Sequence, residues 1–169
     1  ILMKCLKLYD SDDYEHIIDY GPVAPVIPAP RVVGPWMVFL RTCYCLLSHE
    51  PDSDFDKVVD RCYKALMKHH YNPEFDLINE VLNHDFSRPE GPFSQFVYCG
   101  HVIETMWMFM YEAVRRRDTE MFSSAVEKFK RHVEVAWDDV YGGVFRSLDN
   151  VNDNIWKVDK VRWDQSEVL

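Results

Sequence analysis

The sequence has few of the features that mark several large classes of protein. Basic residues are the minority, with 19 Lys and Arg against 28 Asp and Glu and a formal net charge of −9. Nucleic acids and anionic membranes attract basic surfaces, so this balance argues against both as partners. No apolar run approaches the roughly 20 residues that span a bilayer, because Arg41 interrupts the best candidate, 36–47. We therefore expect no nucleic-acid partner and no membrane partner.

Glycine and cysteine are also scarce. With only six glycines, the chain shows neither a glycine-rich phosphate-binding loop nor a Gly-x-Ser-x-Gly motif. The five cysteines are odd in number and lie in apolar helical patterns, which favours buried reduced thiols over disulfides. The amino end does not show the layout of a signal peptide, since acids at 10, 12 and 13 follow Lys4 and Lys7. These features predict a cytoplasmic protein.

What the chain does contain is enough apolar sequence for one core. Hydrophobic residues make up 47% and aromatic residues 14% of the sequence, which is a globular composition. We expect a single domain over 1–169, with a proline-rich extended connector at 21–35 inside it. The sequence starts at Ile1 and stops where a helix is expected to begin. We expect an incomplete fragment of a longer protein, which alone would be poorly soluble or would self-associate.

Apolar periodicity predicts four main helices in two pairs. The first helix of each pair, 36–50 and 101–117, is apolar or aromatic over most of its surface, which marks a buried element. The second, 53–70 and 119–136, carries apolar residues on one side only. This alternation predicts an all-α fold of stacked helical hairpins, with 101–117 the more buried helix of its pair.

Shorter elements are expected between and after these helices. A short strand is predicted at 75–82, followed by a polar loop at 83–91. The Gly142-Gly143 turn needs positive φ, and 144–148 with 155–158 is predicted to form a small hairpin beyond it. A fifth helix is expected to start near Trp163.

His101 is the first candidate for chemistry. Gly100 places it on the first turn of an apolar helix, where the helix dipole should keep the imidazole neutral and able to accept a proton. Glu104, three residues on, lies on the same face and can bond the far ring nitrogen, fixing its tautomer. The alternative is a histidine that only caps the helix. Glu167, taken alone, is equally explained as an acid in the first turn of a helix, where it interacts favourably with the dipole. The tryptophans are equally explained as core residues or as faces that stack on a sugar ring.

Other constellations do not form a site. Asp52-x-Asp54-x-Asp56 lacks the glycine and the final glutamate of a calcium loop, so it is interpreted as a helix cap. Neither the histidines at 69, 70 and 84 nor the Cys43-x-Cys45 pair has a ligand spacing, so no metal site is expected. The arginines at 115–117 are interpreted as a solvated helix end.

Three motifs in order resemble the N-acylglucosamine 2-epimerase family. They are CGHVIETMW at 99–107, WDDVYGGVF at 137–145 and KVRWDQSE at 160–167. The stretch from Trp36 to NEVL at 79–82 is also similar, though more weakly. The resemblance implies an (α/α)6 barrel with short β-hairpin insertions, of which this chain would hold less than half. It also implies an enzyme acting on open-chain sugars without a metal or other cofactor, and a possible homodimer.

The resemblance also assigns roles to residues. His101 would be a catalytic residue with Glu104 as its orienting partner, and Glu167 would contact the substrate. Further substrate-binding candidates are Trp163, Arg162, Glu80 and Trp107. The expected reaction is that of a sugar 2-epimerase, which removes the C2 proton of an open-chain aldose to give an enediolate and returns a proton to the opposite face. An aldose–ketose isomerase of the same superfamily is the alternative.

The chain departs from the family pattern at three positions. Cys99 replaces a proline, Arg162 replaces the first of two tryptophans, and Asp164 replaces another proline. If Arg162 faces the pocket, it could bind a hydroxyl or an acidic group. The family's second histidine and its amino-terminal arginine are expected beyond the ends of this chain, so the 169 residues alone should be inactive. A non-catalytic helical binding module that keeps the fold is the alternative from another class.

Overall fold

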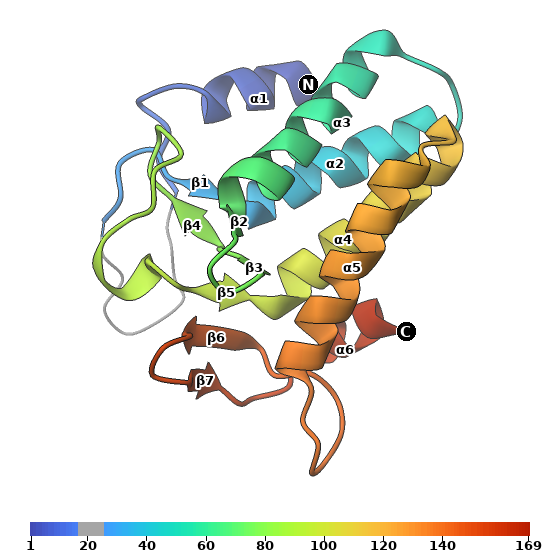
Figure 1. Ribbon diagram of the computed structural model, residues 1–169. Helices are drawn as coiled ribbons and strands as arrows, with labels where there is room; N and C mark the ends of the chain where they lie inside the picture. Colours follow the sequence, from blue (N-terminus) through green and yellow to red (C-terminus); the bar gives the residue numbers. More distant parts are fainter. Residues whose placement is uncertain (17–25) are drawn as a thin grey trace.

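Two helical hairpins form the body of the computed structural model, in which residues 1–16 and 26–169 are described. Helix α2 (Val33–Leu47) is followed by α3 (Ser53–Lys64), and α4 (Cys99–Arg116) is followed by α5 (Thr119–Ala136). The inner helices α2 and α4 pack on each other, while α3 and α5 cover them from one side (Figure 1). The predicted stacked hairpins are therefore confirmed.

The predicted difference in burial is also confirmed. Eleven of the 18 residues of α4 are buried, against four of the 18 in α5. Among the buried residues of α4 are Ile103, Met106 and Phe109, which lie one turn apart on its inner side. An apolar helix enclosed in this way gains about 25 cal/mol for each Å2 of apolar surface removed from water. Its position between α2, α5 and the carboxyl-terminal helix is therefore the centre of the fold.

Side-chain caps set the starts of the two outer helices. The Asp52 carboxylate accepts a hydrogen bond from Asp54 N at 2.8 Å, and Asp118 accepts one from Met121 N at 2.9 Å. Both carboxylates satisfy amide groups that have no partner within the first turn. The interpretation of Asp52 as a cap is thus confirmed.

The helix expected at 53–70 does not continue unchanged to its end. After α3, residues Ala65–His70 form a π-helix (η1). Its side chains Ala65, Leu66 and His70 are buried against the core. The wider π-turn changes which residues face the core just before the chain enters β2. Apolar spacing alone does not reveal such a change.

A helix that the sequence did not predict lies at the amino end. This helix, α1 (Leu2–Tyr9), packs across α2 and places the Tyr9 ring edge-on to Trp36 with the centroids 4.9 Å apart. The predicted connector falls partly on 21–25, outside the described residues. The rest of the connector ends earlier than predicted, because strand β1 (Arg31–Val32) and then α2 begin before Pro35. Pro35 itself lies in the first turn of α2.

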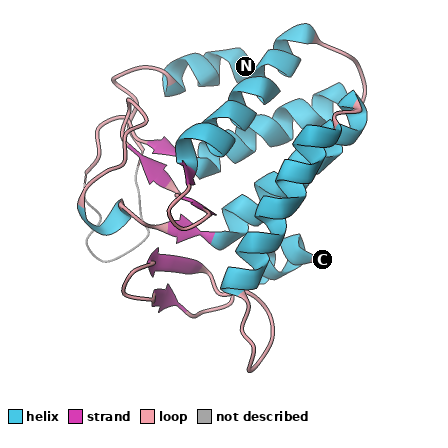
Figure 2. Ribbon diagram, in the orientation of Figure 1, coloured by secondary structure: helices cyan, strands magenta, loops and turns pink. Residues whose placement is uncertain are grey.

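Short antiparallel strands gather beside the amino ends of the inner helices (Figure 2). The predicted strand at 75–82 is split into two pairs around Asn79 and Glu80. The two pairs are β1 with β4 (Val81–Leu82), and β2 (Tyr71–Asn72) with β3 (Leu77–Ile78). Since β1 leads directly into α2, the strands fix where that helix begins.

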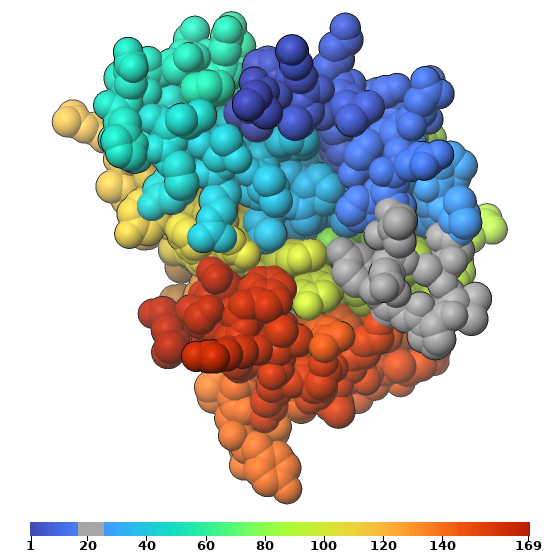
Figure 3. All heavy atoms as spheres, turned by 180° about the vertical axis from the view of Figure 1, so that it is seen from behind, coloured from blue at the N-terminus to red at the C-terminus, as the bar shows by residue number. Residues whose placement is uncertain are grey.

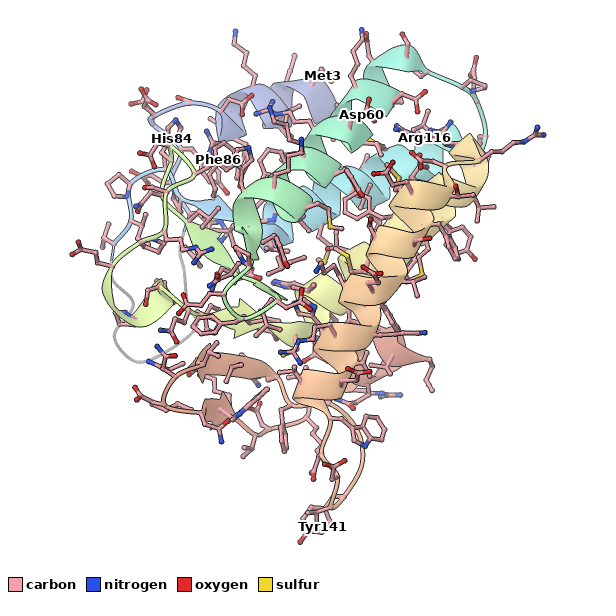
Figure 4. The ribbon with its side chains drawn as sticks, in the orientation of Figure 1. Met3, Asp60, His84, Phe86, Arg116 and Tyr141 are labelled. Atoms are coloured by element: carbon pink, nitrogen blue, oxygen red, sulfur yellow. The ribbon has the colours of Figure 1, made fainter. Side chains whose placement is uncertain are left out.

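The third sheet contains the hairpin that the sequence predicted. Its strands are β5 (Val97–Tyr98), β6 (Ser147–Asn150) and β7 (Ile155–Lys157), in that order. Strand β5 follows the 3-10 turn η2 (Gly91–Phe93) and leads directly into α4. The turn before β6 has positive φ at Gly142 and Gly143, as expected, and Tyr141 at its tip projects away from the body (Figure 4). Helix α6 (Arg162–Val168) closes the chain against α4.

The cysteines are less buried than expected. All five are free thiols, but Cys5 and Cys45 are exposed.

The arginines at the end of α4 form ion pairs, whereas a solvated helix end was expected. Arg115 and Arg116 pair with the buried Glu112 and with acids of α3, including the Arg116–Asp60 pair seen in Figure 4. These ion pairs join the two hairpins. Within the described ranges, no helix has the length and apolarity needed to cross a membrane.

Candidate functional site

The candidate site lies where the amino end of α4 meets α2, α6 and the short strands. Strand β5 delivers His101 onto the first turn of α4, and the junction between β3 and β4 delivers Glu80. Seen from behind, α2, the start of α4 and α6 share one face of the molecule (Figure 3). Residues far apart in the sequence therefore meet on this face.

A buried carboxylate holds the His101 ring. Nδ1 of His101 lies 2.9 Å from Oε1 of Glu80, whose side chain is fully buried. The Glu80 backbone is fixed on both sides, because its N–H donates to Phe96 O and its carbonyl accepts from Val33 N. Gly34 N also donates to Oε1 at 3.4 Å. This contact corrects the expected partnership, in which Glu104 would bond the ring.

The same carboxylate sets the charge of the ring. Burial acts to lower the pKa of His101, but the charge and hydrogen bond of Glu80 outweigh it, and Asp164 and Glu104 add to the effect. The pKa of His101 is therefore raised above its usual value. The expected effect of the helix dipole is thus opposed by Glu80, because a carboxylate in contact favours imidazolium more strongly than the dipole disfavours it.

Two aromatic rings lie next to His101 and next to each other. Tyr98 stacks on the imidazole with ring centroids 4.3 Å apart, and Trp163 lies at 5.6 Å. Tyr98 and Trp163 are nearly parallel, 9° apart, with their centroids separated by 5.9 Å. The structure thus brings Trp163 to the site, together with Tyr98, which the sequence analysis missed.

Glu104 has a different partner from the one expected. Its Oε1 accepts a hydrogen bond of 2.7 Å from Nη1 of Arg41. The Glu104 side chain is 4% exposed, whereas that of Arg41 is 60% exposed. Burial and the nearby Glu167 carboxylate raise the pKa of Glu104, although Arg41 and His101 oppose them. Arg41 is the one charged residue in the apolar sequence of α2, and this was the sequence signal that could have predicted an acidic partner for it.

Glu167 and Trp107 meet one turn further along α4. The Trp107 indole N–H donates to Oε2 of Glu167 at 2.6 Å, and Tyr44 packs edge-on to Trp107 with centroids 6.2 Å apart. This places two of the expected substrate-binding residues together on the α4–α6 seam. Arg162, by contrast, is exposed, and the structure does not bring it to the cavity beside His101.

Asp164, in the first turn of α6, is buried against Gly100. Its carboxyl is fully buried, and neither oxygen has a hydrogen-bond partner within the described residues. Burial raises its pKa to about 7, although His101 and Arg146 favour the ionised form. Only glycine fits opposite it, since a Cβ at Gly100 would lie 2.0 Å from Oδ1. The absence of a side chain at Gly100 therefore allows α6 to pack closely on α4 at Asp164.

A cavity of about 420 Å3 opens beside His101. Its walls are mostly apolar side chains of α2, and its polar groups include two histidines. The lining residues are Tyr14, His16, Gly34, Pro35, Met37, Val38, Phe39 and His101. Tyr14 and His16 were missed because an irregular segment after α1 gives no periodic signal. Across residues 1–16 and 26–169, no group of three or more His, Cys, Asp or Glu residues is placed to hold a metal ion.

This geometry is suited to moving a proton. A histidine whose Nδ1 is fixed by a carboxylate can accept a proton at Nε2 and return it without changing its orientation. Carboxylates and an exposed guanidinium, placed one turn further along, provide groups that bind hydroxyls. Aromatic faces such as Trp107 provide stacking surface.

The fold is shared with several solved enzymes, and 21 chains of solved structures match significantly. A sugar epimerase from a ruminal bacterium has a TM-score of 0.68 at 13% identity, over 89% of this chain and 38% of that one. The cellobiose 2-epimerase from Spirochaeta thermophila DSM 6192 gives 0.67 at 12% identity, over 99% and 47%. A D-mannose isomerase gives 0.65 at 13% identity, over 88% and 37%.

These neighbours show that the fold is part of an (α/α)6 barrel, and that this chain spans less than half the length of each. Among curated proteins, none matches the sequence significantly. The family model for N-acylglucosamine 2-epimerase (GlcNAc 2-epimerase) matches residues 25–169, which is most of the chain. The chain belongs to the N-acylglucosamine 2-epimerase family.

Proposed function

We propose that the protein containing this chain is a sugar epimerase that acts at C2 of an open-chain aldose. The observation that carries the proposal is the His101–Glu80 pair at the edge of a cavity large enough for a small molecule. Family membership and the shared fold support sugar epimerase or isomerase chemistry for the whole protein.

In this proposal His101 moves the proton. Its Nε2 takes the hydrogen from C2, which is acidic because the adjacent aldehyde accepts the electron pair and forms an enediolate. The Glu80 carboxylate stabilises the imidazolium that results and keeps Nδ1 protonated. A raised pKa lets the ring hold the proton while the enediolate persists, and a proton delivered to the opposite face of C2 by a second donor then gives the epimer.

Other residues of the same face bind the sugar. We propose that Glu104 with Arg41, and Glu167 with Trp107, accept and donate hydrogen bonds to its hydroxyls. These groups are already paired with each other, so they present fixed oxygens and N–H groups to a substrate. A preorganised site of this kind loses less entropy on binding.

The test is hydrogen exchange at C2. The full-length protein is incubated in D2O with N-acetylglucosamine, D-mannose and cellobiose, and the C2 hydrogen is followed by NMR. We expect at least one sugar to gain deuterium at C2 and to give its 2-epimer, and a ketose product instead would identify an aldose–ketose isomerase. If none of the sugars exchanges, the proposal fails and a binding module with this fold is favoured.

A further inference from the structure

A second, smaller cavity of about 130 Å3 opens where α2, α3, η1 and the loop after β4 meet. Among the described residues, none lines both this cavity and the one beside His101. Its walls combine aromatic rings with nitrogen donors, and they are formed by Trp36, Arg61, Lys64, Ala65, His69 and Phe86. A space of this size holds a few water molecules or one small polyatomic ion. The cavity therefore suits a compact polar ligand.

One nitrogen donor in the wall is buried without a partner. Trp36 is fully buried, and no described residue accepts a hydrogen bond from its indole N–H. An unpaired donor in the protein interior loses the hydrogen bond that it makes to water in the unfolded chain. Buried polar groups are nearly always paired in native proteins. An unpaired N–H in a cavity wall therefore points to a ligand that brings an acceptor oxygen.

The π-turn at η1 brings a cation and an imidazole to the same cavity. In an α-helix, Lys68 would share the face of Lys64, since residues four apart lie above one another. The wider turn, with its i→i+5 hydrogen bonds, places His69 in line with Lys64 instead, and these two side chains line the cavity. Neither has a hydrogen-bond or ion-pair partner among residues 1–16 and 26–169. Burial lowers the pKa of His69, and the charges of Lys64 and Lys68 lower it further, so the local potential is positive.

The arginines nearby add to this positive charge. The Asp10 carboxylate accepts hydrogen bonds from both Nη atoms of Arg61, with Nη1 and Oδ2 2.8 Å apart, and its Oδ1 lies 3.6 Å from Nη1 of Arg31. One acid is thus shared by two guanidinium groups, and Lys64 supplies a third cation. The Asp10 contact also occupies the planar edge with which Arg61 could bind another carboxylate. The donors left for a ligand are the Lys64 ammonium and single N–H groups of two rings.

We propose that this cavity binds a phosphate group, whose oxygens accept hydrogen bonds from the Lys64 ammonium, the His69 ring and the Trp36 indole. Lysine binds phosphate as a point charge, whereas a planar carboxylate is bound best by a free arginine edge. The three donors come from α3, η1 and α2, and a tetrahedral oxyanion can accept hydrogen bonds from several directions. Free phosphate and a phosphate monoester present the same group, and the test separates them. The site goes beyond the proposed function and uses none of its residues.

The test titrates the full-length protein with sodium phosphate, with sodium chloride at equal ionic strength as the reference. NMR follows the His69 ring, which is assigned from the spectrum of His69→Gln. We expect a saturable shift of its resonances and a rise in its pKa, because an anion in contact favours imidazolium. Phosphate should also raise the Tm, since it binds the folded chain and not the unfolded one. In Lys64→Gln the dissociation constant for phosphate should rise about 10-fold or more.

The matched control is Lys68→Gln. It removes the same charge from the same turn of helix but outside the cavity, so it should bind phosphate as the wild type does. Trp36→Phe removes the buried N–H and should also weaken binding; if this variant fails to fold, the two lysine variants decide the question. Glycerol 3-phosphate repeats the titration. If it binds as tightly as phosphate, the ligand is a monoester, and if only inorganic phosphate binds, the ligand is the free ion; either result supports the site.

Two results would overturn the proposal. One is a His69 ring that responds to phosphate no more than to chloride up to about 20 mM, a range that reveals a dissociation constant near 1 mM. The other is equal weakening in Lys64→Gln and Lys68→Gln, which would show a general attraction to positive charge. No sugar is turned over in these assays, so their outcome is separate from that of the C2 exchange experiment.

Discussion

Two buried histidines should make the stability of this fold steeply dependent on pH. His132 Nδ1 donates to Lys128 O at 2.7 Å, and its Nε2 accepts from Ile78 N at 3.0 Å. His70 Nδ1 donates to Asn79 O at 2.7 Å. The two rings therefore hold the segment directly before Glu80. Protonation of His132 would turn its acceptor nitrogen into a donor that faces another N–H.

The magnitude follows from the pKa values. Burial lowers the pKa of both His70 and His132 to about 4, against about 6.5 in an unfolded chain. Each shift is worth about 3 kcal/mol. Between these values the unfolded chain binds the protons and the folded chain does not. The stabilisation is thus complete above about pH 6.5 and is lost as the pH falls towards 4.

Urea denaturation between pH 7.5 and 5 measures this effect. Asp164 opposes the effect at the top of this window, because its raised pKa of about 7 lets the folded state bind a proton that the unfolded chain does not. We therefore expect the two rings together to contribute a fall of up to about 2.7 kcal/mol per pH unit to the free energy of unfolding, and His132→Gln to remove about half of that contribution. Replacing the exposed His49 in the same way should leave the slope near that of the wild type. A slope in His132→Gln equal to that of the wild type would refute the assignment.

Two further predictions concern the residues around His101. Gly100→Ala should destabilise the fold by about 1–3 kcal/mol or more, since the new Cβ overlaps the Asp164 carboxyl; thermal unfolding measures this, and an unchanged Tm would contradict the packing. Glu80→Gln should lower the pKa of His101, because burial then acts without the opposing charge. An NMR titration of the ring checks the second prediction, and a pKa equal to that of the wild type would show that Glu80 does not set it.

The main helices could be predicted from sequence because their causes are local. Apolar spacing marked α2, α4 and α5 to within a few residues, and the Asp52 cap marked the start of α3. The π-turn at Ala65–His70 was missed since it depends on what the core requires at that point. Helix α1 was missed as well, because its mixed polar and apolar sequence gains its stability from packing on α2.

The site shows the same division between local and long-range causes. His101 was identified by its place after Gly100, and Trp163 and Glu167 by their motif. The partner of His101 was assigned by the i+3 spacing of Glu104, which is a local rule. The actual partner, Glu80, lies 21 residues away and is brought there by the pairing of β1 with β4. No spacing within one helix can reveal a contact made in this way.

Solvent exchange at C2 tests the central claim, that His101 transfers a proton to and from a sugar. The measurement follows deuterium incorporation at C2 of the sugar pair turned over by the full-length protein, compared between wild type and His101→Gln. We expect the wild type to incorporate deuterium at C2 of both epimers as it interconverts them. The variant should stop interconversion and lose exchange from the epimer whose C2 hydrogen faces His101. If the variant interconverts and exchanges both epimers at the wild-type rate, His101 is not the proton carrier and the account is wrong.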